Sequence, residues 1–129
     1  MLNDPLANAL SLIYNLQKTG KSSCEIKPAS KIIKQIVEIM NKNNYIGAVE
    51  ETKSTKGDSL KIALLGSINK CGAIKPRYSV KKDEYEKYEK RYLPARDFGI
   101  IFIATPEGII THQEAKKKNI GGRLLAYCY

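Results

Sequence analysis

The chain has 129 residues, and 22 Lys and Arg against 13 Asp and Glu give it a formal charge of +9. A hydrophobic fraction of 43%, with nine Gly and five Pro, excludes a long disordered, fibrous or low-complexity chain. The longest strongly apolar stretch, residues 98–104, is far shorter than the ~20 residues that a membrane-spanning helix needs. We therefore expect a folded basic protein of one domain or two small subdomains, without a membrane segment.

Two helices are predicted in the first half of the chain. Asp4 followed by Pro5 is a strong helix start, and Gly20 ends that helix. Ser30 is expected to cap a second helix, in which apolar residues recur at three- and four-residue spacing over 32–40.

Three strands complete this half. They are predicted at 22–27, 45–52 and 59–65, and the last two form a hairpin around a polar turn. The two helices should cover one face of this small sheet.

Strands dominate the second half. Residues 74–80 contain a proline and predict an edge segment, whereas 98–104 predict a buried strand. Residues 81–92 are charged and rich in tyrosine, which fits either a helix or a solvated connection. The predicted fold is α+β, with an N-terminal two-helix, three-strand half (residues 1–70) packed on a mostly antiparallel C-terminal β half with a short helix (residues 71–129).

The C-terminal segment begins with a turn at 105–108. Residues 111–114 form a capping box that opens a short helix through Lys118, and Gly121-Gly122 is expected to stop it. One of these glycines fits a left-handed helix cap, and the second indicates that another backbone comes near. Residues 123–129 predict a final strand, with Tyr127 and Tyr129 on the same face as Leu125.

The positive charge is spread over the chain. Residues 1–70 carry ten basic and six acidic side chains, and residues 71–129 carry twelve and seven. Such a surface attracts polyanions, because neutralising phosphates releases condensed counterions. Nucleic acid is therefore the leading partner.

The residues offer little reactive chemistry. Cys24, Cys71 and Cys128 lack the spacing of a zinc site and the density of a disulfide scaffold, so we expect reduced, buried thiols and an intracellular protein. The one histidine, His112, fits an exposed helix residue better than a ligand of RNA phosphate. We predict no enzyme, no metal and no cofactor.

The loop at 104–108 is the candidate contact. Its small residues allow close approach, and the Thr105 hydroxyl, backbone amides and Gly108 suit sugar hydroxyls and base edges, although a plain connecting turn has the same composition. Lys116, Lys117 and Lys118 fit either a solvated helix end or phosphate contacts.

The sequence resembles the small-subunit ribosomal protein eight family, in its archaeal and eukaryotic form, along its whole length. The segments that carry the resemblance are Asn3 to Leu10, Pro28 to Lys31, Lys75 to Tyr78, Phe98-Gly99, Thr105 with Gly108, Thr111-His112 with Glu114-Ala115, and Gly121 to Tyr127. The resemblance implies a structural protein of the cytoplasmic ribosome that binds an irregular helix in the central domain of small-subunit rRNA early in assembly. It further implies other small-subunit proteins as partners and a monomer when free.

In the family, a Ser-Thr-Ser-x-Gly loop of the C-terminal half approaches an internal bulge of the RNA. Here Ala104, Pro106 and Glu107 depart from that pattern, so only Thr105 and Gly108 transfer directly. Glu107 would be repelled by phosphates, and we expect it to pair with Arg123 or Lys116.

The predicted RNA-binding residues come from both halves of the chain. They are Asn3, Asp4, Asn8, Ser30, Lys31, Lys34, Arg77, Tyr78, Thr105, Pro106, Glu107, Gly108, Thr111, His112, Lys116, Lys117, Gly121, Gly122, Arg123 and Tyr127. Two alternatives stay open from the residues alone. The first is a basic protein–protein adaptor within a ribonucleoprotein assembly, and the second is an RNA-modifying enzyme that would depend on His112.

Overall fold

A computed structural model of the chain describes residues 5–26, 31–53, 55, 57–74, 77–95 and 98–129. It divides into two compact units, residues 1–69 and residues 70–129, each with its own sheet. The architecture is mixed α and β with antiparallel sheets, which confirms the predicted α+β class.

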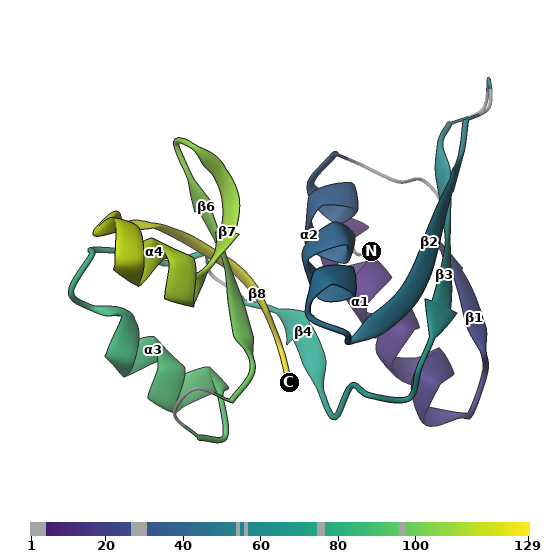
Figure 1. Cartoon of the computed structure of the whole chain (residues 1–129), viewed down its shortest axis with the longest axis horizontal. Helices are drawn as coiled ribbons and strands as arrows, with labels where there is room; N and C mark the ends of the chain where they lie inside the picture. Colours follow the sequence, from purple (N-terminus) through teal and green to yellow (C-terminus); the bar gives the residue numbers. More distant parts are fainter. Residues whose placement is uncertain (1–4, 27–30, 54, 56, 75–76, 96–97) are drawn as a thin grey trace. The chain divides into compact units, whose positions relative to one another are not determined.

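The first unit contains two helices and a three-stranded sheet (Figure 1). Its elements are α1 (Pro5–Lys18), β1 (Ser23–Ile26), α2 (Lys31–Lys42), β2 (Ile46–Thr52) and β3 (Ser59–Leu64). The strands pair antiparallel in the order β1-β3-β2, with β2 and β3 forming the predicted hairpin. The two helices lie together beside the sheet, as the sequence pattern indicated.

Apolar periodicity explains these elements. On α2, Ile33, Ile36, Val37 and Met40 are buried at the three- and four-residue spacing of a single helix face. On β3, Leu60 and Ile62 are buried while Lys61 between them is exposed, which is the two-residue alternation of a strand with one covered face. The predicted caps Asp4 and Ser30 lie outside the described residues.

The second unit contains a five-stranded sheet and two short helices. Its elements are β4 (Cys71–Ala73), β5 (Ser79–Val80), α3 (Tyr85–Tyr92), β6 (Ile100–Thr105), β7 (Gly108–Thr111), α4 (His112–Lys118) and β8 (Gly122–Cys128). The order is β4-β8-β6-β7, and β5 pairs with β8 as well. These strands pair antiparallel, and β8 holds β4, β5 and β6 together.

The helix α3 resolves the open choice for residues 81–92. Tyr85 and Tyr88 are buried in a cluster with Ile101, Ile103 and other apolar residues. The Tyr85 hydroxyl donates a hydrogen bond of 2.8 Å to the carbonyl of Ile120. The tyrosine stripe therefore attaches α3 to the rest of this unit.

Two local predictions for this unit are wrong, and one strand was not predicted. Helix α4 ends at Lys118 as predicted, but its cap is Asn119, which adopts the left-handed conformation with φ of 55°, and the glycines that follow do not cap it. The strand β7 (Gly108–Thr111) has no counterpart in the prediction, which placed Gly108 in the turn and Thr111 at the helix cap and assigned nothing to residues 109–110. A β-bulge in the β6–β8 pairing shifts the alternation of β8, so Leu124 rather than Leu125 joins the cluster that includes Tyr127 and Tyr129.

Candidate nucleic-acid interface

The loop singled out in the sequence is the tip of the β6–β7 hairpin. Thr105 pairs with Gly108 at the end of the ladder, and Pro106 and Glu107 between them are exposed. Gly108 has φ of 122°, a backbone conformation that a side chain would strain. The tip is therefore a two-residue turn that a glycine makes possible.

The Thr105 hydroxyl organises this turn. It donates a hydrogen bond of 2.8 Å to the carbonyl of Gly108 and accepts one of 3.2 Å from the Glu107 backbone N–H. A hydroxyl has one proton to donate and two lone pairs to accept with. Thr105 thus offers a ligand one further acceptor position, while its proton is used inside the loop.

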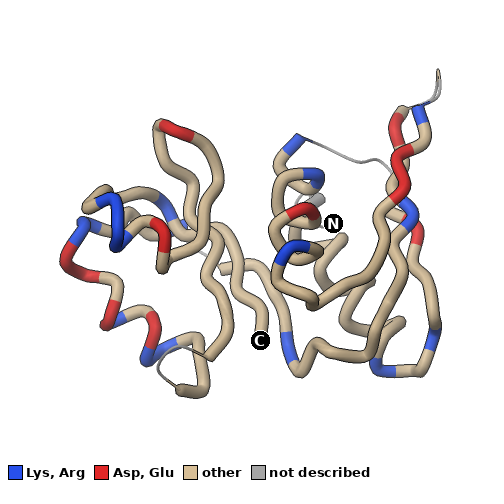
Figure 2. Tube along the Cα trace, in the orientation of Figure 1, with Lys and Arg blue, Asp and Glu red and all other residues tan. Residues whose placement is uncertain are grey.

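Glu107 pairs with Lys118, at 3.2 Å between Oε2 and Nζ. The prediction that Glu107 pairs with Arg123 or Lys116 is wrong. Lys116 forms its ion pair with Glu89, and Lys118 is the lysine of α4 that lies beside the tip. Both Glu107 and Lys118 are exposed, so the pair is weak in water and open to exchange. Figure 2 shows the acidic position at the tip of β6–β7 and the basic positions along α4.

Two adjacent glycines let the start of strand β8 lie close to two other backbone segments, β5 and β6. A Cβ on Gly122 would lie 2.4 Å from the Ala104 carbonyl oxygen, and one on Gly121 would lie 2.4 Å from the Val80 carbonyl oxygen. The expectation that another backbone comes near is confirmed, and it holds for both glycines. Arg123 follows directly, is exposed, and lies opposite Ala104 in the ladder, one residue from Thr105.

His112 is buried, with 1% of its surface exposed, so the expectation of an exposed helix residue is wrong. Its Nδ1 accepts a hydrogen bond of 3.1 Å from the Ile101 backbone N–H, and its Nε2 lies 3.4 Å from Oε1 of Glu89. The Thr111 hydroxyl caps α4 by accepting from the Glu114 N–H, and this cap places the next side chain inward. The imidazole therefore joins β6, α3 and α4, and burial keeps it from phosphate.

Glu89, which the sequence reasoning missed, is the other half of this arrangement. It is 8% exposed and also forms an ion pair with Lys116, so Lys116 neutralises a buried carboxylate. The signal for Glu89 is present in the sequence, since it lies four residues after Tyr85 on the same side of the helix. Lys117 is the exposed basic residue between Lys116 and Lys118.

Aromatic rings form a row beside the sheet of this unit. The Tyr92 and Tyr127 ring centroids lie 5.6 Å apart, and those of Tyr127 and Tyr129 lie 6.2 Å apart. The guanidinium of Arg91 lies over Tyr92 at 5.6 Å and over Tyr78 at 5.4 Å. Burial raises the pKa of the Tyr127 hydroxyl above its ordinary value.

The RNA-binding residues predicted in the first unit differ in their exposure and contacts. Asn8 and Lys31 are exposed, whereas Lys34 is half-buried and lies 2.6 Å from Glu51 and 2.8 Å from Asp58. The hydrogen bond to Asp58 is the main cause that raises the pKa of Lys34. Lys34 thus ties α2 to the β2–β3 hairpin. Asn3, Asp4 and Ser30 lie outside the described residues.

The structure brings together one group of predicted residues in the second unit. This group, which we call the hairpin-tip surface, consists of Thr105, Pro106, Glu107, Gly108, Gly122 and Arg123. Lys118, which is not among the predicted RNA-binding residues, joins it through Glu107, and the predicted Lys117 is the exposed neighbour of Lys118 in α4. Tyr78 and Tyr127 belong to the aromatic row instead, and exposed Arg77 adjoins Tyr78 in sequence. His112, Lys116 and the capping residue Thr111 serve the interior.

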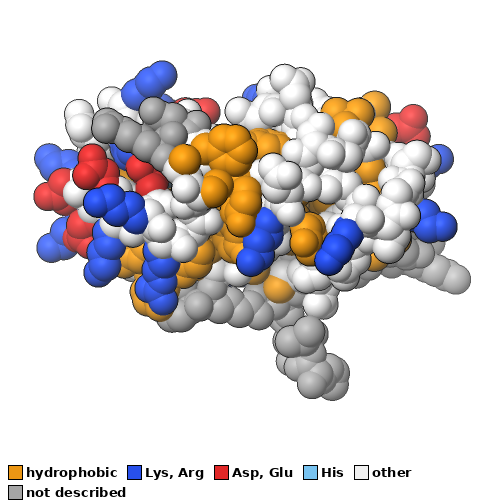
Figure 3. Space-filling view, turned by 90° about the horizontal axis from the view of Figure 1, so that it is seen from below, with side chains coloured by type: hydrophobic (Ala, Val, Ile, Leu, Met, Phe, Trp, Pro, Cys, Tyr) orange, Lys and Arg blue, Asp and Glu red, His pale blue; other side chains and the backbone are white. Residues whose placement is uncertain are grey.

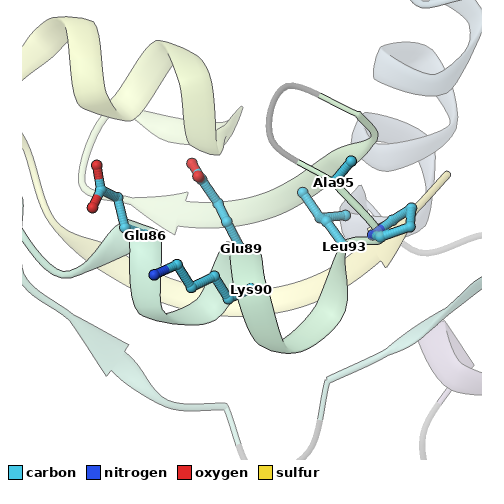
Figure 4. A pocket seen from close by; sticks show the side chains of 6 residues that line it. Glu86, Glu89, Lys90, Leu93 and Ala95 are labelled. Atoms are coloured by element: carbon cyan, nitrogen blue, oxygen red, sulfur yellow. The ribbon is translucent and has the colours of Figure 1, made fainter.

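A cavity of about 390 Å³ lies against α3 (Figure 4). Glu86, Glu89 and Lys90 line it together with Leu93, Pro94 and Ala95. Figure 4 shows the carboxylates of Glu86 and Glu89 projecting from the same side of the helix. Among the described residues, no group of three or more His, Cys, Asp or Glu side chains is placed to hold a metal ion.

The fold and these contacts define a basic α+β protein in which polar groups brace the structure around an exposed hairpin tip. Lys and Arg side chains are scattered over the face drawn in Figure 3, and at its left end they lie among Asp and Glu side chains, in keeping with the even spread of charge along the sequence. The chain belongs to the family Ribosomal protein S8, which matches residues 4–129.

Membership of this family identifies a ribosomal protein that binds rRNA in the small subunit and takes part in translation. The family is one of structural, non-enzymatic ribosomal proteins, and its place in the cell is the ribosome. Across the residues described, no helix is both long and apolar enough to span a membrane.

Proposed function

We propose that the protein binds directly to the central domain of small-subunit rRNA, recognises an irregular helix there, and helps to assemble the 30S subunit in the cytoplasm. The hairpin-tip surface is the contact that we assign to this RNA. We further propose that the protein is a monomer when free and meets other small-subunit proteins only in the particle.

The observation that supports this proposal most directly is the bracing of the tip. The Thr105 hydroxyl closes the turn, Gly108 permits it, and the Gly122 backbone lies against Ala104. A tip held in this way loses little conformational entropy on binding. It presents backbone groups and one acceptor lone pair at close range, which suits the splayed base edges of a bulged helix better than the deep groove of regular A-form RNA.

The charges near the tip support a division of roles. Arg123, opposite Ala104 in the ladder, and Lys117, next to Lys118 in α4, are exposed cations, and the Glu107–Lys118 pair is weak enough to open when RNA approaches. We assign the cations to phosphate, where they supply affinity without sequence information. We assign the tip itself to the irregular feature.

Binding of the full chain to two RNAs tests the proposal. One RNA is the irregular helix of the central domain, and the other is a regular duplex of the same length and charge. We expect clear preference for the irregular helix and hydroxyl-radical protection centred on its bulge. Equal affinity for both RNAs would contradict the proposal and favour the adaptor alternative.

The salt dependence of binding separates the two roles. Lys117→Ala should weaken binding to both RNAs alike and reduce the slope of log K against log salt by about 0.7 to 0.9, because one phosphate contact is lost. Lys21→Ala is the matched control, since Lys21 is an exposed lysine of the first unit that we assign to no contact. An unchanged slope for Lys117→Ala would remove this lysine from the interface.

A further inference from the structure

Two of the three cysteines face each other across neighbouring strands. Cys71 on β4 and Cys128 on β8 are register partners in an antiparallel pair, and both are buried thiols that form no disulfide. They lie 57 positions apart in the sequence, so only the strand register brings them together. The third, Cys24, lies opposite Ile62 in the other unit.

The backbone hydrogen bonds fix which kind of pair this is. Lys70 and Tyr129, one step toward the strand ends, exchange both hydrogen bonds, at 2.9 and 2.8 Å. Hydrogen-bonded and non-hydrogen-bonded pairs alternate along an antiparallel ladder, so Cys71 and Cys128 form a non-hydrogen-bonded pair. In such pairs the Cα atoms are about 4.5 Å apart and the side chains are closest.

This spacing matches what a disulfide requires. Bridged cysteines have Cα atoms about 4.4 to 6.8 Å apart, and the side chains of directly opposed residues project from the same face of the sheet. Little backbone movement is therefore needed to join the two sulfurs. From this register we propose that Cys71 and Cys128 are a latent redox site that forms a cross-strand disulfide when the protein meets an oxidised low-molecular-weight disulfide.

The chemistry balances as a double thiol–disulfide exchange. Cys71, as its thiolate, attacks one sulfur of the small disulfide; the sulfur–sulfur bond breaks, and the released thiolate takes up a proton. The Cys128 thiolate then attacks Cys71 Sγ in the mixed disulfide and releases the second small thiol, which also takes up a proton. Two protein thiols become one disulfide, and one small disulfide becomes two thiols.

The surroundings make this step slow but possible. Burial raises the pKa of Cys71 to about 12 and raises that of Cys128 as well, so thiolate is scarce in the folded state. However, β4 is a three-residue strand at the end of the sheet order, and such an edge opens locally at low cost. Cys71 on this edge strand is thus the residue that an oxidant reaches first.

A closed bridge would have a measurable effect on stability. The loop from Cys71 to Cys128 includes α3, β6, β7 and α4, which is almost the whole second unit. Cross-linking a loop of this length restricts the unfolded chain and raises the melting temperature. Reduction should return the melting temperature to its starting value.

The test uses the full chain with Cys24→Ser, which leaves the pair as the only thiols. Incubated with oxidised glutathione under native conditions, this variant should lose both thiols, as titrated after unfolding, and should lose the mass of two hydrogen atoms. Peptide mapping should join Cys71 to Cys128. Retention of both thiols, stable glutathione adducts on either cysteine, or linked dimers would each overturn the proposal.

The equilibrium in a glutathione buffer tests whether the fold itself promotes the bond. The ratio of disulfide to dithiol should be at least ~10-fold higher under native conditions than in urea, because the fold holds the sulfurs together. An equal or lower native ratio would mean that the strand register disfavours the bridge, and would contradict the proposal. The double variant Cys24→Ser, Cys128→Ala is the control that cannot close the bridge. Oxidation should not raise its melting temperature.

Discussion

Each of the two units is stabilised internally by a different kind of contact. The first unit packs apolar helix faces on a sheet, and its main ion pairs, from Lys34 to Glu51 and Asp58, lie at the surface. Within the described residues, all the polar side chains that are buried, namely Glu89, Thr111 and His112, lie in the second unit. The second unit also contains the closest backbone approaches, at Gly121 and Gly122.

This difference shows how a fold can hold a loop in place. Apolar packing tolerates substitution because it has little direction, whereas buried hydrogen bonds and backbone contacts demand one geometry. The second unit, which carries the hairpin-tip surface, uses the demanding kind. Single substitutions should therefore cost more there than in the first unit, and the following variants test this in order of expected effect.

Gly122→Ala should be the most damaging change. Its Cβ would lie 2.4 Å from the Ala104 carbonyl oxygen, and a backbone atom cannot move aside as a side chain can. We expect a loss of about 3 kcal/mol in the free energy of unfolding, measured by urea denaturation. Gly20→Ala in the first unit is the control: it has φ of 85° but no atom within 4 Å, so backbone strain alone should cost about 1 kcal/mol. Equal losses would erase the contrast between the units.

His112→Leu should come next. The change leaves the Ile101 N–H without its acceptor and removes one of the contacts of the buried Glu89 carboxylate. A buried group left unsatisfied costs about 1 to 3 kcal/mol, and we expect about 2 kcal/mol in unfolding free energy, with faster amide exchange at Ile101. Gln113→Leu, on the exposed next residue, should change stability by less than about 0.5 kcal/mol. A neutral His112→Leu would show that this polar cluster does not brace the unit.

Thr105→Val should act on RNA binding more than on stability. It keeps the shape of the side chain but removes both hydrogen bonds that close the turn. We expect a loss of about 1 to 2 kcal/mol in binding to the irregular helix, with the salt slope unchanged because no charge is lost. Thr105→Ser keeps the hydroxyl and should bind like the original chain. If Ser and Val behave alike, the hydroxyl has no role in recognition.

The smallest effect should be a pH dependence in the first unit. Hydrogen bonding to Lys34 lowers the pKa of Asp58 below its usual 3.8, so the carboxylate is favoured in the folded state. The resulting stabilisation is fully present above pH 3.8 and is lost as the pH falls through the lowered pKa. Asp58→Asn should thus reduce the melting temperature slightly at neutral pH, and the two proteins should converge once the pH lies below the lowered pKa of Asp58. A difference that persists in acid would assign the effect to packing.

Local patterns predicted most of the secondary structure. The stripe from Ile33 to Met40 and the apolar strand at 100–103 depend on neighbours in the sequence, and both occur where the periodicity indicated. The Thr111 cap is equally local, because its hydroxyl meets the N–H three residues later. The sequence left open whether residues 85–92 form a helix, because a stripe of tyrosines stabilises a helix only when other apolar residues cover it. In the structure, Tyr85 and Tyr88 are covered in this way.

The candidate site likewise has features that local sequence patterns predict and features that depend on tertiary contacts. The sequence by itself determined the basic charge, the loop of small residues at 104–108 and the family, because these follow from composition and from short runs of residues. That this loop is the tip of a hairpin was decided by the pairing of β6 with β7. Only the tertiary structure decided that His112 points inward to Ile101 and Glu89, that Glu107 meets Lys118, and that Cys71 faces Cys128. Those contacts join residues far apart in the chain, and strand register and helix docking, which no local pattern encodes, bring them within bonding distance.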